Sequence, residues 1–312
     1  KCLGESIIIV WLLILSSFFF GGVMPASSAI LIDLTDTEKR KAAFSLLYLG
    51  HNIGFAIGPV IAGFLFNNFI EWIFLGDALT TGISLLLVFF FVNESLPAKE
   101  RIVERDGPER AEKGSLLRVL WQRPFLLAFM LITIILTFIY SQYTFSLPLQ
   151  LLEIIKEAGP GNYGLLMSVN AIIVISLTTL VIHLTNRMKP VLTVALASLL
   201  FAVGFGVIFF IRSMPMFFIS TVIWTVGEIL EATNSGVYIA NHSPISHRGR
   251  FNSIMPIIHA SGFAMSPLLI GVLIEKSSLR SVWPLLFLLG IIAAAALFLL
   301  YRIERKAKKR LG

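Results

Sequence analysis

Nine long apolar runs follow one another along this chain of 312 residues. A helix needs about 20 mostly apolar residues to cross a bilayer, and lipid offers the backbone no hydrogen-bond partners, so each run must be helical. A buried helix of a water-soluble protein could imitate one such run, but not nine in succession. We therefore expect an all-α polytopic membrane protein. The nine expected spans are residues 6–32, 43–68, 72–93, 125–149, 162–185, 190–211, 215–240, 252–274 and 283–301.

The composition agrees with lipid as the solvent. Hydrophobic residues make up 56% of the chain and charged residues 14%, against about 25% charged in an ordinary soluble domain. The net charge of +7 could suggest nucleic acid, but the basic residues stand between apolar runs and form no soluble basic domain. We expect the lipid bilayer as a partner and no nucleic acid.

The lysines and arginines predict the orientation, because cytoplasmic loops carry an excess of them. With the link between the first two spans in the cytoplasm, that side holds twenty basic residues and the other side five. Residues 98–123 mix both charges with Gly and Pro, which is typical of a linker. We expect a multi-pass protein of the cell membrane, with this central linker and the C-terminus in the cytoplasm.

An unusual pattern occurs twice. The string "HNIGFAIGPVIAG" from His51 to Gly63 is matched 208 residues later by "HASGFAMSPLLIG" from His259 to Gly271. Such recurrence predicts two related halves. Three spans precede the linker and six follow it, so residues 1–97 are expected to be the remainder of a first bundle and residues 124–312 a complete second bundle. Three further helices are expected ahead of Lys1.

Two six-helix halves, a charged central loop and cytoplasmic ends together resemble the major facilitator superfamily of secondary transporters. The resemblance runs through the whole chain, as helices four to twelve of a six-plus-six bundle. Several strings in the sequence resemble the drug:proton antiporter branch. They are "GHNIGFAIGPVIAG", "NESLP", "YSQYTFSLPL", "YGLLMSVN" and "GE" followed by "SPISHRGRFN".

The first of these strings is similar to the glycine motif on helix five of the superfamily's antiporters. Its matching residues are Gly50, Gly54, Gly58, Pro59 and Gly63, with alanine where the motif has one more glycine. Spacing of four puts the first three glycines on one helical face, where another backbone can approach closely. We expect a tight seam between the halves; general small-residue packing is the alternative.

Three acids fall inside spans: Asp77, Glu228 and Glu231. A charge at the centre of a bilayer costs about 2.5–3.5 kcal/mol on insertion scales, so it should face a cavity or a partner. Glu228 and Glu231 share one face, and repulsion between them favours a proton on one. We expect them to bind a proton or a cationic substrate, with a structural hydrogen-bonded pair as the alternative. Asp77, near the outer end of its span, could instead cap or reach the interface.

Two neutral polar residues lie in otherwise apolar spans, Gln142 and Asn170. Either could bind substrate or tie helices together. Helices four, seven and ten line the cavity in the family that the chain resembles, which favours Gln142 and Glu228 over Asn170. The drug-exporter branch usually carries an arginine on helix four, whereas this chain offers Ser16, Ser17 or Phe18, so the resemblance supplies no relay arginine there.

Four charged residues stand at cytoplasmic helix ends: Asp33, Arg40, Arg248 and Arg250. They are expected to help latch the cytoplasmic side closed, with ordinary interfacial charge as the alternative. No spacing of His, Cys or carboxylates suggests a metal site, and no phosphate-binding loop of an ATPase occurs. We expect no cofactor.

The expected function is secondary active transport, with a small apolar or cationic compound leaving as protons enter, by alternating access in a monomer. A proton symporter or facilitator for a metabolite is the alternative. Acidic embedded charges and phenylalanine-rich spans favour cations over sugars or anions. A polytopic membrane enzyme is a remote alternative. No catalytic cluster is visible in the sequence, so we do not expect an enzyme.

Overall fold

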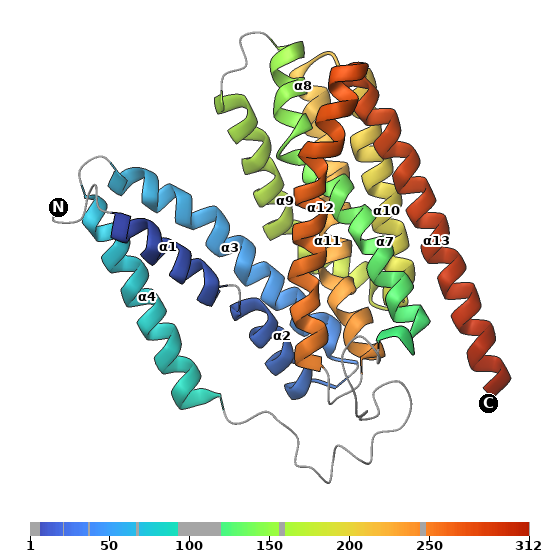
Figure 1. Ribbon diagram of the computed structural model, residues 1–312, viewed down its shortest axis with the longest axis horizontal. Helices are drawn as coiled ribbons and strands as arrows, with labels where there is room; N and C mark the ends of the chain where they lie inside the picture. Colours follow the sequence, from blue (N-terminus) through green and yellow to red (C-terminus); the bar gives the residue numbers. More distant parts are fainter. Residues whose placement is uncertain are drawn as a thin grey trace.

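The computed structural model describes residues 7–20, 22–36, 38–66, 69–92, 120–155, 160–243 and 248–311 as helices and their connections, with no strand among them (Figure 1). The helices before the long connection are α1 (Ile7–Phe20), α2 (Val23–Leu34), α3 (Arg40–Phe66) and α4 (Ile70–Phe91). Those after it are α7 (Pro124–Tyr140), η2 (Ser141–Tyr143), α8 (Ser146–Ile154), α9 (Pro160–Thr185), α10 (Pro190–Gly206), η3 (Val207–Phe210), α11 (Met214–His242), α12 (Arg248–Lys276), η5 (Leu279–Ser281) and α13 (Val282–Leu311).

Prolines mark where several helices begin. Pro124, Pro160 and Pro190 are the first residues of α7, α9 and α10, and Pro215 is the second residue of α11. The first turn of a helix has N–H groups without intrahelical partners, so a residue without an N–H costs nothing there. The sequence thus sets these boundaries locally.

Two of the expected spans are broken in the structure. The expected span 6–32 is split between α1 and α2, and the span 125–149 is interrupted by the 3₁₀ turn η2 before α8. Pro25 and Pro148 lie in the first turn of α2 and α8, where neither can donate to the carbonyl four residues earlier. The breaks therefore follow from proline chemistry.

The described residues contain seven stretches that are long and apolar enough to cross a membrane, which makes this a multi-pass membrane protein. They are Glu71–Phe91, Pro124–Ile154, Asn162–Thr185, Pro190–Phe210, Met214–His242, Pro256–Lys276 and Leu279–Ala307. These coincide with seven of the nine expected spans. The other two fall on α1–α2 and α3. Most of the expected linker, residues 98–119, lies outside the described residues.

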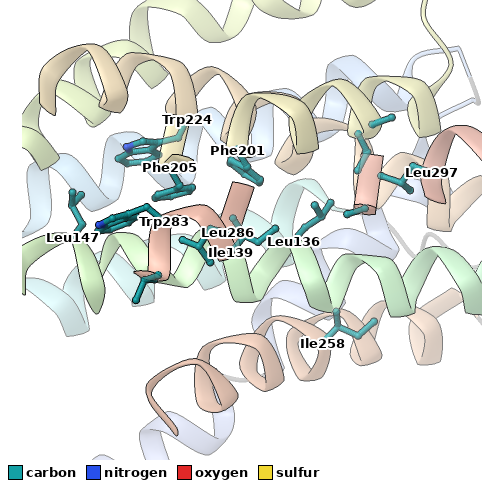
Figure 2. Packing of buried hydrophobic residues seen from close by; sticks show 14 of the residues in the cluster. Leu136, Ile139, Leu147, Phe201, Phe205, Trp224, Ile258, Trp283, Leu286 and Leu297 are labelled. Carbon is teal, nitrogen blue, oxygen red and sulfur yellow. The ribbon is translucent and has the colours of Figure 1, made fainter. Parts of the chain in front are cut away.

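The main hydrophobic core lies in the second bundle, among α7, α10, α11, α12 and α13. Figure 2 shows its aromatic part, where the rings of Phe205 and Trp224 stack with centroids 5.7 Å apart. A Cβ added at Gly204 would lie 2.8 Å from the backbone nitrogen of Trp224, so only glycine allows α10 to come this close to α11. The core fixes α11, which carries the principal embedded acid.

The two bundles meet where α3 begins and where α9 and α11 end; we call this the Arg40 end. A small hydrophobic cluster joins them, made of Ile32 on α2, Phe44 on α3, and Val237 and Ala240 on α11. From there α3 runs away from α11, as Figure 1 shows. The bundles therefore form a wedge that is packed at the Arg40 end.

Candidate functional site

Glu228 lies midway along α11, between Met214 and His242. It is partly buried and points toward the place where α3 and α9 pass α11. Trp224, one turn earlier, is anchored in the core, which fixes the rotation of α11 about its axis. The carboxylate is thereby held at the junction of three helices.

Both oxygens of Glu228 accept hydrogen bonds. The hydroxyl of Tyr48 on α3 donates to Oε1 over 2.8 Å, and Nδ2 of Asn170 on α9 donates to Oε2 over 2.8 Å. Asn170 also donates to Oγ1 of Thr225 over 3.0 Å, which orients its amide. Glu228 is thus held by neutral donors, Tyr48 and Asn170 from two other helices, with the hydroxyl of Tyr140 on α7 also within hydrogen-bond reach.

No basic side chain pairs with Glu228 in the part of the chain that the structure describes. Besides Tyr48, the titratable groups that face it are Tyr140, Tyr143 and, three residues further on α11, Glu231. Glu231 accepts a hydrogen bond from Ser235 Oγ over 2.8 Å. Neutral donors do not cancel a charge, so a proton or a bound cation is what can neutralise Glu228 within the membrane.

Aromatic rings stand beside this carboxylate. Tyr140 and Tyr143, on α7 and η2, have ring centroids 4.7 Å apart, and each also contacts Trp224 and Phe263. Both tyrosines lie at the end of α7 and in the turn that follows it, and their rings reach Trp224 on α11. Ring faces attract cations, so a carboxylate beside aromatic rings suits a positively charged organic ligand.

The two neutral polar candidates are placed differently. Asn170 contacts Glu228 directly, whereas Gln142 is fully buried and ties η2 to α12. The Gln142 amide donates to Ser266 Oγ, and its Oε1 accepts from Ser146 Oγ over 2.6 Å. Asn170 thus belongs to the group of side chains around Glu228, while Gln142 lies in the packing between η2 and α12; the binding roles expected for both stay predictions.

Asp77 is exposed on α4 and is not among the groups around Glu228. The window of α4 that could cross a membrane has no buried residue. The structure therefore separates Asp77 from the other two embedded acids.

The glycine motif lies within α3. Among the described residues, a Cβ added at Gly50 or Gly54 would meet nothing within 4 Å, so this part of the structure shows no tight seam at these two glycines. The surroundings of Gly58, Pro59 and Gly63 lie outside the described residues. Gly262, the repeat partner of Gly54, is closely packed: an added Cβ would lie 2.7 Å from Thr137 Cβ.

The Arg40 end contains two of the four expected latch residues. Arg40 is fully buried and its Nη1 donates to Asn241 Oδ1 on α11 over 2.7 Å, joining the bundles. Asp33 lies near the end of α2 and is partly exposed. Arg248 and Arg250 begin α12, and their side chains lie outside the described residues.

Sequence reasoning missed Tyr48 and Asn241. Tyr48 lies eight residues after Arg40, two turns along the same face of α3, and that spacing was the available signal. Asn241 lies beside His242 at the end of α11 and carries no recognisable pattern. No group of three or more His, Cys, Asp or Glu that could hold a metal occurs in the described ranges.

The chain matches the family model of the Major Facilitator Superfamily over residues 3–228 and 151–312. It is 27% identical over 222 residues to the MFS-type transporter YqjV of Bacillus subtilis (strain 168), covering 69% of this chain and 52% of that one. It is 23% identical over 264 residues to a Na⁺, Li⁺, K⁺/H⁺ antiporter of Planococcus maritimus, covering 78% and 62%. The chain thus spans about half to three-fifths of the length of these relatives.

A solved structure has a similar fold. The human organic anion transporter MFSD10 (TETRAN) matches with a TM-score of 0.68 over 88% of this chain and 67% of its own. The two sequences are 16% identical, so the likeness concerns the fold alone.

Proposed function

The chain belongs to the major facilitator superfamily, and from that premise we propose that the whole protein is a proton-coupled exporter of small apolar or cationic compounds. The observation that carries the proposal is Glu228. It lies midway along α11, is held by Tyr48 and Asn170, and has no basic partner among the described residues. Protons and cations therefore compete for one carboxylate, which is the requirement for exchange.

Alternating access about this carboxylate gives the direction of transport. The wedge is packed at the Arg40 end, which the distribution of basic residues assigns to the cytoplasm. Glu228 is then reached from the outside, where a proton binds and displaces the outgoing cation. The protein acts in the cell membrane as a monomer, without an enzymatic step or a cofactor.

An exporter of organic cations is favoured over one of alkali cations by the half-buried aromatic rings of Tyr140 and Tyr143 beside the carboxylate. Alkali-cation exchange is the second candidate, because one relative carries out Na⁺, Li⁺ and K⁺ exchange for protons by its name. Glu228 Oε1, the Tyr48 hydroxyl and Thr225 Oγ1 supply oxygen atoms of the kind that hard cations bind.

The test uses the full-length protein in inside-out vesicles with an acidic interior. Uptake of a cationic dye, and separately of Na⁺, is followed in wild type, Glu228→Gln and the matched variant Glu231→Gln. We expect gradient-driven dye uptake that is lost in Glu228→Gln and retained at least in part in Glu231→Gln.

Each other outcome has its own meaning. Na⁺ movement without dye movement selects the second candidate. Movement of neither points to a metabolite symporter or facilitator. Equal dye uptake in wild type and Glu228→Gln keeps export and removes Glu228 from the coupling site.

A further inference from the structure

The contacts between α3 and the second bundle fall on one stripe of α3. Lys41 Nζ donates to the backbone oxygen of Thr185, the last residue of α9, over 2.5 Å. One turn on, the ring of Phe44 fills the space beside Gly236, where an added Cβ would lie 2.6 Å from the ring. A further turn on, Tyr48 donates to Glu228. Successive turns of a helix present one face, so these contacts act together.

Tyr48 is where this stripe ends. Within the described part of α3, it is the last residue whose side chain hydrogen-bonds to the second bundle. Beyond it Gly50 and Gly54 meet open space, and Ile53 and Ile57 are exposed. The bond between Tyr48 and Glu228 therefore lies at the point where the wedge begins to open.

Asn170 and Tyr140 approach Glu228 from within the second bundle, and among the described residues only the bond from Tyr48 crosses between the bundles. Asn170 and Thr225 belong to α9 and α11 of the second bundle, whereas Tyr48 belongs to α3 of the first. A hydrogen bond to a charged carboxylate is roughly twice as strong as one between neutral groups. Neutralising Glu228 therefore weakens the one side-chain bond by which this site holds the two bundles together.

We propose that Tyr48 is the positioning residue through which the charge of Glu228 controls the contact between the two bundles. This inference rests on the proposed function. With Glu228 charged and empty, Tyr48 holds the Arg40 end packed, so the empty carrier does not return. When a proton neutralises Glu228, the bond weakens and α3 is free to leave α9 and α11. Tyr48 thus prevents uncoupled return of the empty carrier.

Among the described groups around Glu228, Tyr48 is the one that belongs to the first bundle. The titratable side chains that face the carboxylate are Tyr48 from α3, Tyr140 and Tyr143 from α7 and η2, and Glu231 from α11; α9 contributes the neutral Asn170. Tyr140 and Tyr143 belong to the second bundle, as Glu231 does. None of these three can transmit a change in the charge of Glu228 to α3 through a direct hydrogen bond.

The test measures distances between spin labels in the protein in lipid nanodiscs, with the native cysteines, Cys2 among them, replaced. One pair, Leu46→Cys with Leu184→Cys, reports the Arg40 end; another, Ile57→Cys with Leu165→Cys, reports the open end. All four positions are exposed. In wild type we expect the packed population at the Arg40 end to grow as pH rises, because Glu228 loses its proton.

In Tyr48→Phe, which lacks only the hydroxyl, we expect this pH response to be lost at both label pairs. In vesicles the same variant should let the cationic dye run down its own gradient without protons. The matched control is Tyr163→Phe, which removes a hydroxyl that donates to the backbone oxygen of Tyr143 over 3.1 Å within the second bundle. The control should keep the wild-type response.

The two proposals fail separately. The role of Tyr48 is overturned if Tyr48→Phe shows the same pH response as wild type, or if the label distances of wild type do not change with pH. Either result would stand even if dye transport depends on Glu228. If Tyr48→Phe loses the pH response but the wild-type protein transports neither dye nor Na⁺, the role of Tyr48 stands and the proposed function is rejected.

Discussion

Two embedded polar residues of this protein, both fully hydrogen-bonded, differ in whether they carry a charge that no described basic side chain compensates. Gln142 has both ends of its amide bonded to side chains, Ser266 on α12 and Ser146 on α8. Glu228 has both oxygens bonded and yet keeps its charge uncompensated by any basic side chain in the described ranges. We therefore expect a structural role for the completed neutral network and propose the uncompensated charge as the place where a ligand binds.

Gln142→Leu should therefore lower stability. The leucine has a similar volume but leaves the hydroxyls of Ser266 and Ser146 without their partner, at a cost of about 1–3 kcal/mol for buried polar groups. Thermal unfolding in detergent, followed by circular dichroism, measures the loss. Ser168→Ala is the control, since this exposed hydroxyl donates to the backbone oxygen of Gly164 in its own helix.

A Gln142→Leu protein that unfolds at the wild-type temperature and yet loses transport would contradict the structural role. It would support the substrate-binding role that the sequence suggested for Gln142.

Among the helices, the two copies of the repeated pattern have different surroundings. Gly262 on α12 packs against α7, where an added Cβ would lie 2.8 Å from the backbone nitrogen of Phe138. Gly54, at the matching position of α3, has open space around it. The same residue type thus serves close packing in one copy and is unpacked in the other.

Gly262→Ala should destabilise the second bundle, because α12 must shift away from α7; such overpacking costs about 1–3 kcal/mol. Gly54→Ala should leave stability unchanged or slightly raised, since alanine favours a helix more than glycine does. Unfolding temperatures of the two variants in the same detergent make the comparison. Equal losses in both would show that α3 is as tightly packed at Gly54 as α12 is at Gly262.

At the scale of the whole molecule, the wedge and the charge distribution together define a direction across the membrane. The connections that the sequence assigns to the cytoplasm include the one after α9, and those assigned outside include the one between α12 and α13. The proposed function depends on this assignment, since it decides from which side a proton reaches Glu228.

Cysteine labelling checks the orientation. In a background without native cysteines, Ser278→Cys should react with a membrane-impermeant maleimide on intact cells, and Asn186→Cys only after the cells are made permeable. Both positions are exposed. The opposite labelling pattern would invert the topology and turn the proposed exporter into an importer.

The sequence by itself determined the helical, membrane-spanning character of the chain. Lipid leaves the backbone no alternative to a helix, and the apolar runs coincide with seven spanning stretches of the structure. It also singled out Glu228, because a carboxylate in the middle of an apolar run is conspicuous whatever the fold. Proline chemistry at Pro25 and Pro148 could have predicted the two breaks as well.

The tertiary structure decided which polar residues meet. Tyr48 and Glu228 are 180 positions apart in the chain, and no periodicity within either helix indicates the rotation and tilt with which α3 passes α11. Those depend on packing between helices, such as Phe44 beside Gly236 and Trp224 against Gly204. Contacts between distant helices are set by the shapes of many side chains at once, so only the folded chain brings Tyr48 to Glu228 and leaves Asp77 apart.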